Sequence, residues 1–201
     1  MIIDDHPADR RQERRGQTRT ALLDAAERLW AERGIHGASL DDIAGAAGLT
    51  KGAVYSNFTG KTDLLLALLD RHTQNDRGDM CEELRDGGRS LKDRFEQAGR
   101  NYARRLDGDD ARLLALLLVE FWLYGMRDFA AGWRIADWYA TRRGNLTREL
   151  TDVDGISATE RATMAMAMDF GLAFQHLLDP DRVPAETYAS GMRLVLGPAL
   201  P

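Results

Sequence analysis

The sequence predicts an all-α protein of about nine helices, in which a three-helix head is followed by a helical bundle. Three observations support this fold class. Apolar residues recur three and four positions apart along nearly the whole chain, which is helical spacing. Sustained apolar/polar alternation and hairpin dipeptides between β-branched runs, the signals of strands, are missing from the sequence. Glycines, prolines and capping residues divide the periodic stretches into short helices first and longer helices afterwards.

Composition limits the classes of protein that this chain can form. Its 201 residues, 44% of them hydrophobic, suffice for a small head fused to a larger body. The net charge of -5 disfavours a protein coated in positive charge, but it permits a local DNA-binding face because only cations that reach phosphates contribute. The single cysteine, Cys81, is typical of a reducing compartment. The longest apolar run, residues 113–119, is too short to span a bilayer, so we expect a cytoplasmic protein without a membrane segment.

The N-terminal region is basic and leads into the first predicted helix. Residues 10–19 contain five arginines and one glutamate, and residues 1–16 are predicted to form a flexible basic arm. This arm is interpreted equally well as a solvated terminus or as an arm that touches DNA. The first helical stripe then ends at Gly34, a residue type that commonly terminates helices, and comprises Leu22, Ala25, Ala26, Leu29 and Trp30.

Residues 39–58 have the pattern of a helix-turn-helix. Ser39 is placed to cap a short second helix, whose first turn carries Asp41 and Asp42, where negative charge suits the helix dipole. Gly48 can adopt the left-handed conformation that a tight turn requires. Thr50 is placed to cap a third helix of about two turns. Because these signals follow one another at the required spacing, we predict the helix-turn-helix arrangement here.

The third helix has a composition that stability alone does not explain. Gly52 and Ala53 lie near its start, where small residues let the helix backbone approach another surface. Lys51 and Lys61 stand at the starts of the third and fourth helices, where the dipole disfavours positive charge. A phosphate opposite each lysine would explain both positions, because N-terminal amides and a lysine together form an anion site. The alternative of an ordinary helical hairpin leaves both lysines unexplained.

The body of the chain continues with longer helical stretches. One lies near residues 91–106, and another, over residues 110–126, is apolar nearly all round, as expected of a helix at the centre of a bundle. A third covers residues 129–150. Ser157 and Glu160 form a capping-box signature that opens a helix to about Leu178, and Pro184 opens a last helix that ends near Gly197. We place the head at residues 17–62 and the body at residues 63–201.

The segment G-L-T-K-G-A-V-Y-S-N-F-T-G-K resembles the DNA-binding head of the TetR family of transcriptional regulators. The resemblance covers about residues 17–69 and implies that Tyr55 and Lys61 contact phosphates. It also implies that further head residues face the major groove or its edges, and that Phe58 belongs to the core. The predicted DNA-binding set is Ser39, Thr50, Lys51, Gly52, Ala53, Tyr55, Ser56, Asn57 and Lys61. Gly60 departs from the family pattern, which more often has a polar cap there.

The resemblance further implies a homodimer that reads a palindromic operator in double-stranded DNA and answers to a small-molecule effector. The last two helices would pair with their symmetry mates through an apolar stripe, although a stripe can equally pack inside one monomer. The predicted interface comprises Ala162, Met166, Phe170, Phe174, Leu177, Met192 and Val195. The predicted effector contacts, whose alternative is an ordinary aromatic core, are Tyr102, Glu120, Phe121, Trp122, Tyr124, Phe129 and Trp133.

Other functional classes find little support in the sequence. It contains no Gly-rich phosphate loop, no His-Glu-x-x-His and no nucleophile elbow, and its four histidines are scattered. We therefore expect neither an enzyme nor a metal or other cofactor. The sequence favours a ligand-responsive repressor. It leaves open an activator-type regulator, or a helical small-molecule-binding protein with a degenerate head.

Overall fold

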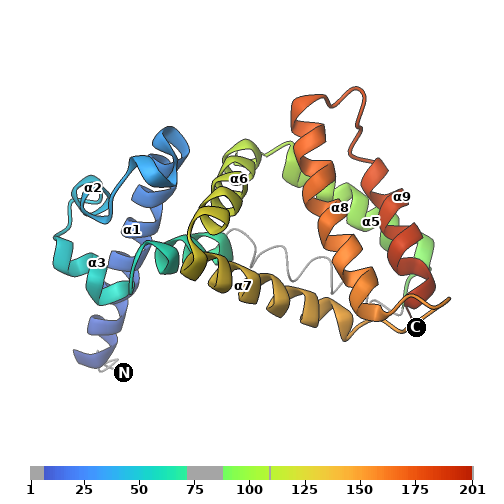
Figure 1. The fold of residues 1–201 in the computed structure, drawn as a ribbon, viewed down its shortest axis with the longest axis horizontal. Helices are drawn as coiled ribbons and strands as arrows, with labels where there is room; N and C mark the ends of the chain where they lie inside the picture. Colours follow the sequence, from blue (N-terminus) through green and yellow to red (C-terminus); the bar gives the residue numbers. More distant parts are fainter. Residues whose placement is uncertain (1–6, 72–87, 109, 201) are drawn as a thin grey trace, which may run out of the picture. The chain divides into compact units, whose positions relative to one another are not determined.

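The computed structural model describes residues 7–71, 88–108 and 110–200 and is helical through most of them (Figure 1). Residues 61–71 are helical. Within the described ranges the one extended pairing is an isolated bridge between Val153 and Ile156. For the part of the chain that the structure describes, the all-α prediction and the predicted number of about nine helices are confirmed. The other helices are α1 (Pro7–Gly37), α2 (Leu40–Ala46), α3 (Lys51–Asn57), α5 (Leu91–Leu106), α6 (Ala111–Arg127), α7 (Phe129–Thr147), α8 (Ala158–Leu178), α9 (Thr187–Leu196) and a 3-10 turn at Gly197–Ala199.

The chain forms two compact units. The first contains the residues up to Arg71 together with Leu117–Gly132, and the second contains His72–Leu116 and Trp133–Pro201. The first unit therefore includes residues 63–71 and most of α6 in addition to the residues predicted as the head. Residues 1–6 of the predicted arm, and Cys81, lie outside the described residues. Residues 7–16 of that arm continue α1 as helix, because no glycine or proline interrupts the helix before Gly16.

The core of the first unit forms where the stripe of α1 meets α2, α3 and the segment 61–71. Leu22, Trp30, Ile43, Val54 and Phe58 are all at most 1% exposed. The indole Nε1 of Trp30 donates to the carbonyl of Ala38 over 3.4 Å, which satisfies its polar atom inside the core. These contacts hold α1, α2 and α3 together as one three-helix head.

The predicted end of the first helix at Gly34 is a break rather than an end. Gly34 has φ 70° and ψ 165°, and α1 resumes for one further turn to Gly37. A side chain at position 34 would be strained by this backbone, and its Cβ would lie 3.1 Å from Glu120 Oε2. Glycine thus allows both the break and the close approach of α6.

The second unit is built on α5, α8 and α9, which pack side by side (Figure 1). The rings of Tyr102 and Tyr188 stack with centroids 3.8 Å apart. A Cβ added at Gly99 would lie 2.7 Å from that of Ala189, so α5 and α9 approach closely at this glycine. Arg161 is buried and donates to the carbonyls of Val195 and Val153, which ties α8 to the end of α9 and to the bridge region.

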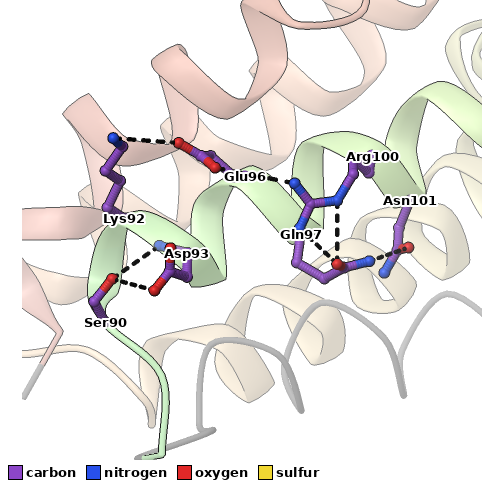
Figure 2. Close-up of polar contacts among 7 residues, drawn as sticks. All are labelled: Ser90, Lys92, Asp93, Glu96, Gln97, Arg100 and Asn101. Carbon is purple, nitrogen blue, oxygen red and sulfur yellow. Dashed lines mark hydrogen bonds and ion pairs between the residues drawn. The ribbon is translucent and has the colours of Figure 1, made fainter.

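An N-cap and a series of side-chain contacts stabilise α5 along its polar side (Figure 2). Ser90 caps the helix by accepting from the amide of Asp93 over 3.2 Å, and its hydroxyl donates to the Asp93 carboxylate over 2.7 Å. Further along, Arg100 donates to the side-chain oxygen of Gln97, and the side-chain nitrogen of Gln97 donates to the side-chain oxygen of Asn101. These neighbours are three and four residues apart, so they support the helix locally while its opposite side carries the buried Phe95 and Tyr102.

The prediction that residues 110–126 are buried on all sides is wrong. In α6 Leu117, Leu118 and Phe121 are buried, whereas an apolar row three and four residues apart is exposed. The apolar composition of this helix therefore overestimated its burial in the single chain. The exposed row comprises Leu116, Val119, Trp122 and Met126. Within the described ranges, no helix combines the length and the apolar character that crossing a membrane would need.

Candidate nucleic-acid interface

The helix-turn-helix is confirmed at its first helix. Ser39 is the N-cap of α2, and its hydroxyl oxygen accepts from the amide of Asp42 over 3.1 Å. The Asp42 carboxylate accepts in return from the backbone amide of Ser39 over 2.8 Å, which completes a capping box. These hydrogen bonds lower the pKa of Asp42. Ser39 is exposed, as the predicted DNA-binding set requires, but its hydroxyl already serves the cap.

The turn between α2 and α3 depends on Gly48. This residue has φ 66°, the left-handed conformation predicted for it. Its amide donates to the carbonyl of Gly45, and the amide of Leu49 donates to the carbonyl of Ala44 over 2.9 Å, so the end of α2 is closed by backbone hydrogen bonds. Thr50 then caps α3 by accepting from the amide of Ala53, as predicted.

α3 presents one face to the core and another to solvent. Val54 is buried, and Phe58, which directly follows the helix, is 1% exposed. Lys51, Gly52 and Ser56 are exposed, and the Tyr55 ring is 53% exposed although tyrosine is a large aromatic residue. The structure therefore brings the predicted residues of α3 onto one short, solvent-facing helix, except that Ala53 and Asn57 are half-buried.

The amide of Asn57 is used inside the head. Its Nδ2 donates to the carbonyl of Ala53 over 2.8 Å, while its Oδ1 is buried without a hydrogen-bond partner. Arg19 lies against the same end of α3, with its guanidinium 4.4 Å from the centroid of the Phe58 ring and a hydrogen bond to the carbonyl of Asn57. Asn57 thus faces inward more than the sequence predicts, because the last turn of α3 packs against α1.

Lys51 already has an anionic partner in this structure. Its ammonium nitrogen lies 2.7 Å from a carboxylate oxygen of Asp41 and 5.9 Å from the centroid of the Tyr55 ring. The hydrogen bond to Asp41 raises the pKa of Lys51. Sequence reasoning explained Asp41 only through the dipole of α2. It missed this contact across the turn, for which the opposite charges ten residues apart were the available signal.

Lys61 and Glu120 meet at one backbone residue, Ile35. The ammonium of Lys61 donates to the carbonyl of Ile35 over 2.6 Å, and the Glu120 carboxylate accepts from the amide of Ile35 over 3.0 Å. Partial burial lowers the pKa of Lys61. An ammonium has three donors, so two N–H groups remain for other partners after the bond to Ile35. Gly60 needs no polar side chain of its own, because Asp63 accepts from the amide of Thr59 at the start of segment 61–71.

The predicted effector residues are distributed between the two units. Tyr102 is a core residue of the second unit, where its hydroxyl donates to the carbonyl of Asp169 and burial raises its pKa. Phe121 is fully buried in the first unit. Glu120 serves the Ile35 amide in the same unit, where Tyr124 lies against His36 and Thr62. In the chain itself the neighbours of these residues are other side chains and backbone groups. The exposed members are Trp122, Phe129 and Trp133.

The predicted dimer stripe is also divided by the structure. Ala162 and Met192 are buried in the core of the second unit within the single chain. Met166, Phe170, Phe174, Leu177 and Val195 are half-buried. Three further apolar residues of the same two helices are exposed, Met164 and Leu178 on α8 and Leu194 on α9. Met164 and Leu178 were not predicted, because a sequence does not show which face of each helix the core will cover.

Comparison with known proteins agrees with this geometry. The family described as "Bacterial regulatory proteins, tetR family" matches residues 22–68. The transcriptional activator FasR of Mycolicibacterium smegmatis is 46% identical over 65 residues, which are 32% of this chain and 28% of FasR. The chain thus matches less than a third of that relative's length.

Solved structures match over most of the fold. One described as a TetR-family transcriptional regulator from Rhodococcus sp. has a TM-score of 0.68 at 21% identity and covers 90% of this chain and 99% of its own. The complex of SmeT with triclosan has a TM-score of 0.62 at 18% identity and covers 92% of each chain. SmeT is the repressor of a multidrug efflux pump in Stenotrophomonas maltophilia.

The capped α2, the turn at Gly48 and the exposed α3 define the first unit as a helix-turn-helix head. The match over residues 22–68 shows that this head is similar to that of the bacterial regulatory proteins of the tetR family.

Proposed function

We propose that this protein is a ligand-responsive DNA-binding transcriptional regulator that acts in the cytoplasm as a homodimer. In the proposed cycle it binds a palindromic operator as a repressor and is released by a small-molecule effector. The observation that carries the proposal is α3 itself, a capped helix whose start is small and cationic and whose Tyr55 ring is 53% exposed. An aromatic and a lysine on the open face of a second helix suit recognition of the major groove and its phosphates.

Within this proposal each exposed residue of α3 has a distinct role. Gly52 and Ala53 are small, so they let the backbone of α3 come close to the base edges in the DNA major groove. Tyr55 donates its hydroxyl to a phosphate, and Lys61 offers its two remaining N–H groups to another. Thr50, Lys51 and Ser56 face base edges or the nearby backbone. Asn57 joins them only after exchanging its bond to Ala53, so we assign it the smallest contribution.

The dimer is proposed to form through α8 and α9. Met164, Leu178 and Leu194 are exposed there, at 41%, 86% and 78%. A pair of such helices from each of two chains would bury these residues in a four-helix interface and hold two α3 helices at the spacing of operator half-sites, roughly 34–36 Å or a multiple of it.

The proposed effector response is supported by a ligand complex of a structure with this fold and by a small number of exposed aromatic residues. A solved structure of this fold holds triclosan, which supports a small molecule of aromatic or apolar character as the effector class. The exposed rings of Trp122, Phe129 and Trp133 remain our candidates for contacts to it. Because FasR is an activator, activation is the second candidate; the position of the bound site relative to a promoter distinguishes the two.

The test is selection of bound sequences from a random duplex library by the purified protein, followed by binding measurements across a salt series. We expect an inverted repeat to emerge. Tyr55→Phe should lower its affinity about tenfold or more, since one hydrogen bond to a charged group is lost. Glu32→Gln, which alters an exposed acid on α1, is the matched control and should bind like the unchanged protein. Failure to enrich any sequence would contradict the proposal.

A further inference from the structure

The pair formed by Asp41 and Lys51 has a consequence for DNA binding that rests on the proposed function. Lys51 is the first residue of α3, and its ammonium nitrogen lies 2.7 Å from a carboxylate oxygen of Asp41, in the first turn of α2. Both side chains are exposed, at 62% and 53%. The pair therefore sits on the surface of the head, beside the open face of α3 that is proposed to meet DNA.

The two acids at the start of α2 differ in what the fold requires of them. The Asp42 carboxylate completes the capping box by accepting from the backbone amide and the hydroxyl of Ser39. Asp41 takes no part in that cap, and its carboxylate instead accepts from the ammonium of Lys51. Stability of the helix-turn-helix thus accounts for Asp42, whereas Asp41 is the acid whose partner belongs to the predicted DNA-binding set.

A phosphate or base edge that approaches Lys51 must meet this carboxylate. The ammonium is compact, and a phosphate within hydrogen-bond distance of it lies only a few ångströms from Asp41, where two negative charges repel each other. Tyr55 lies beside this pair, because its ring centroid is 5.9 Å from the Lys51 nitrogen. DNA must therefore either displace Asp41 from Lys51 or bind against its charge.

We propose that Asp41 is a positioning residue that competes with DNA for Lys51 and so sets the electrostatic strength of the head. In the free protein the carboxylate neutralises the lysine. On DNA the lysine exchanges the carboxylate for an acceptor on the nucleic acid. The competition lowers affinity for any duplex, and it makes tight binding depend on the other contacts of α3, including those to base edges.

The experiment is a double-mutant cycle with Asp41→Asn and Lys51→Met, measured on the selected operator and on a random duplex. At about 50 mM salt we expect Asp41→Asn to bind both duplexes about three- to tenfold tighter. Its plot of log affinity against log salt should steepen by up to about 0.9, the slope of one additional phosphate contact. In the Lys51→Met background the gain from Asp41→Asn should fall below twofold.

Three outcomes would overturn the inference. If the gain persists in the Lys51→Met background, Asp41 acts as a general negative charge and not through Lys51. If Asp41→Asn weakens binding, the carboxylate holds Lys51 in place for DNA and does not compete for it. An unchanged affinity would show that the pair has no effect on binding.

Controls separate this inference from the proposed function. Amide exchange of Ile43 and Val54 in both variants checks that the head remains folded, as expected because both changed side chains lie on its surface. Glu32→Gln removes an exposed acid from α1 and controls for net charge. Absence of DNA binding by the unchanged protein contradicts the proposed function, whereas a failed cycle on a protein that binds DNA contradicts only the role of Asp41.

Discussion

At the scale of single residues, several charged side chains of this protein bind backbone groups. Both backbone polar groups of Ile35 are bound by charged side chains. Lys61 donates to its carbonyl, and its amide donates to the Glu120 carboxylate. Arg161 likewise donates to two carbonyls inside the second unit. Such partners leave no trace in a sequence, because any residue supplies the same amide and carbonyl. For this reason Glu120 was interpreted as an effector contact from its apolar neighbours.

The role of Glu120 can be tested at the amide that it serves. Glu120→Ala should leave the Ile35 amide without its acceptor and destabilise the first unit by about 1–2 kcal/mol. Glu120→Gln keeps an acceptor oxygen and should lose less than half as much. Amide hydrogen exchange at Ile35 reports the change locally. Equal exchange rates in the unchanged protein and in Glu120→Ala would contradict the assigned contact.

At the scale of elements, capping and turn residues decided where the short helices begin and end. Ser39, Thr50 and Ser157 all cap as predicted, since an N-cap depends only on residues within one turn of it. Gly48 adopts the predicted left-handed conformation for the same local reason. Burial of α6 was predicted wrongly, because the number of faces that a helix buries depends on partners distant in sequence.

The turn of the helix-turn-helix offers a matched pair of glycines. Gly48→Ala should destabilise the first unit by about 1 kcal/mol, because φ 66° is strained for alanine even though a Cβ there meets no atom within 4 Å. Gly45→Ala, inside α2 and equally open, should stabilise it by up to about 1 kcal/mol. Exchange of the buried Ile43 amide measures both changes. A gain at both positions would show that the turn does not need glycine.

The capping box of α8 makes a prediction about pH. Hydrogen bonds from the Ser157 hydroxyl and backbone amide lower the pKa of Glu160 below its ordinary 4.5. Its stabilising contribution is therefore complete above pH 4.5 and is lost as the pH falls through the lower, folded-state pKa. The difference in stability between the unchanged protein and Glu160→Gln should shrink from pH 7 to pH 3 in denaturant titrations. A difference that does not vary with pH would exclude the charge of Glu160 as its cause.

At the scale of the whole molecule, the proposed homodimer depends on apolar residues that one chain leaves exposed. Leu194→Glu should convert the dimer to a monomer in sedimentation experiments, because a charge placed in a packed interface lacks a partner. Met126→Glu on α6 replaces an apolar residue that is 76% exposed, compared with 78% for Leu194, and should leave the dimer intact. A monomeric unchanged protein, or a dimeric Leu194→Glu, would contradict the interface on α9.

The sequence by itself determined the all-α class, the capped helix-turn-helix and the family of its head, because these depend on periodicity and on residues within a turn or two of each other. Only the tertiary structure decided which predicted residues are available to a partner. It buried Tyr102, Ala162 and Met192, turned Asn57 inward and paired Lys51 with Asp41. A helical stripe specifies that one face will be covered, but it does not specify what covers it, since that depends on packing between segments far apart in the chain.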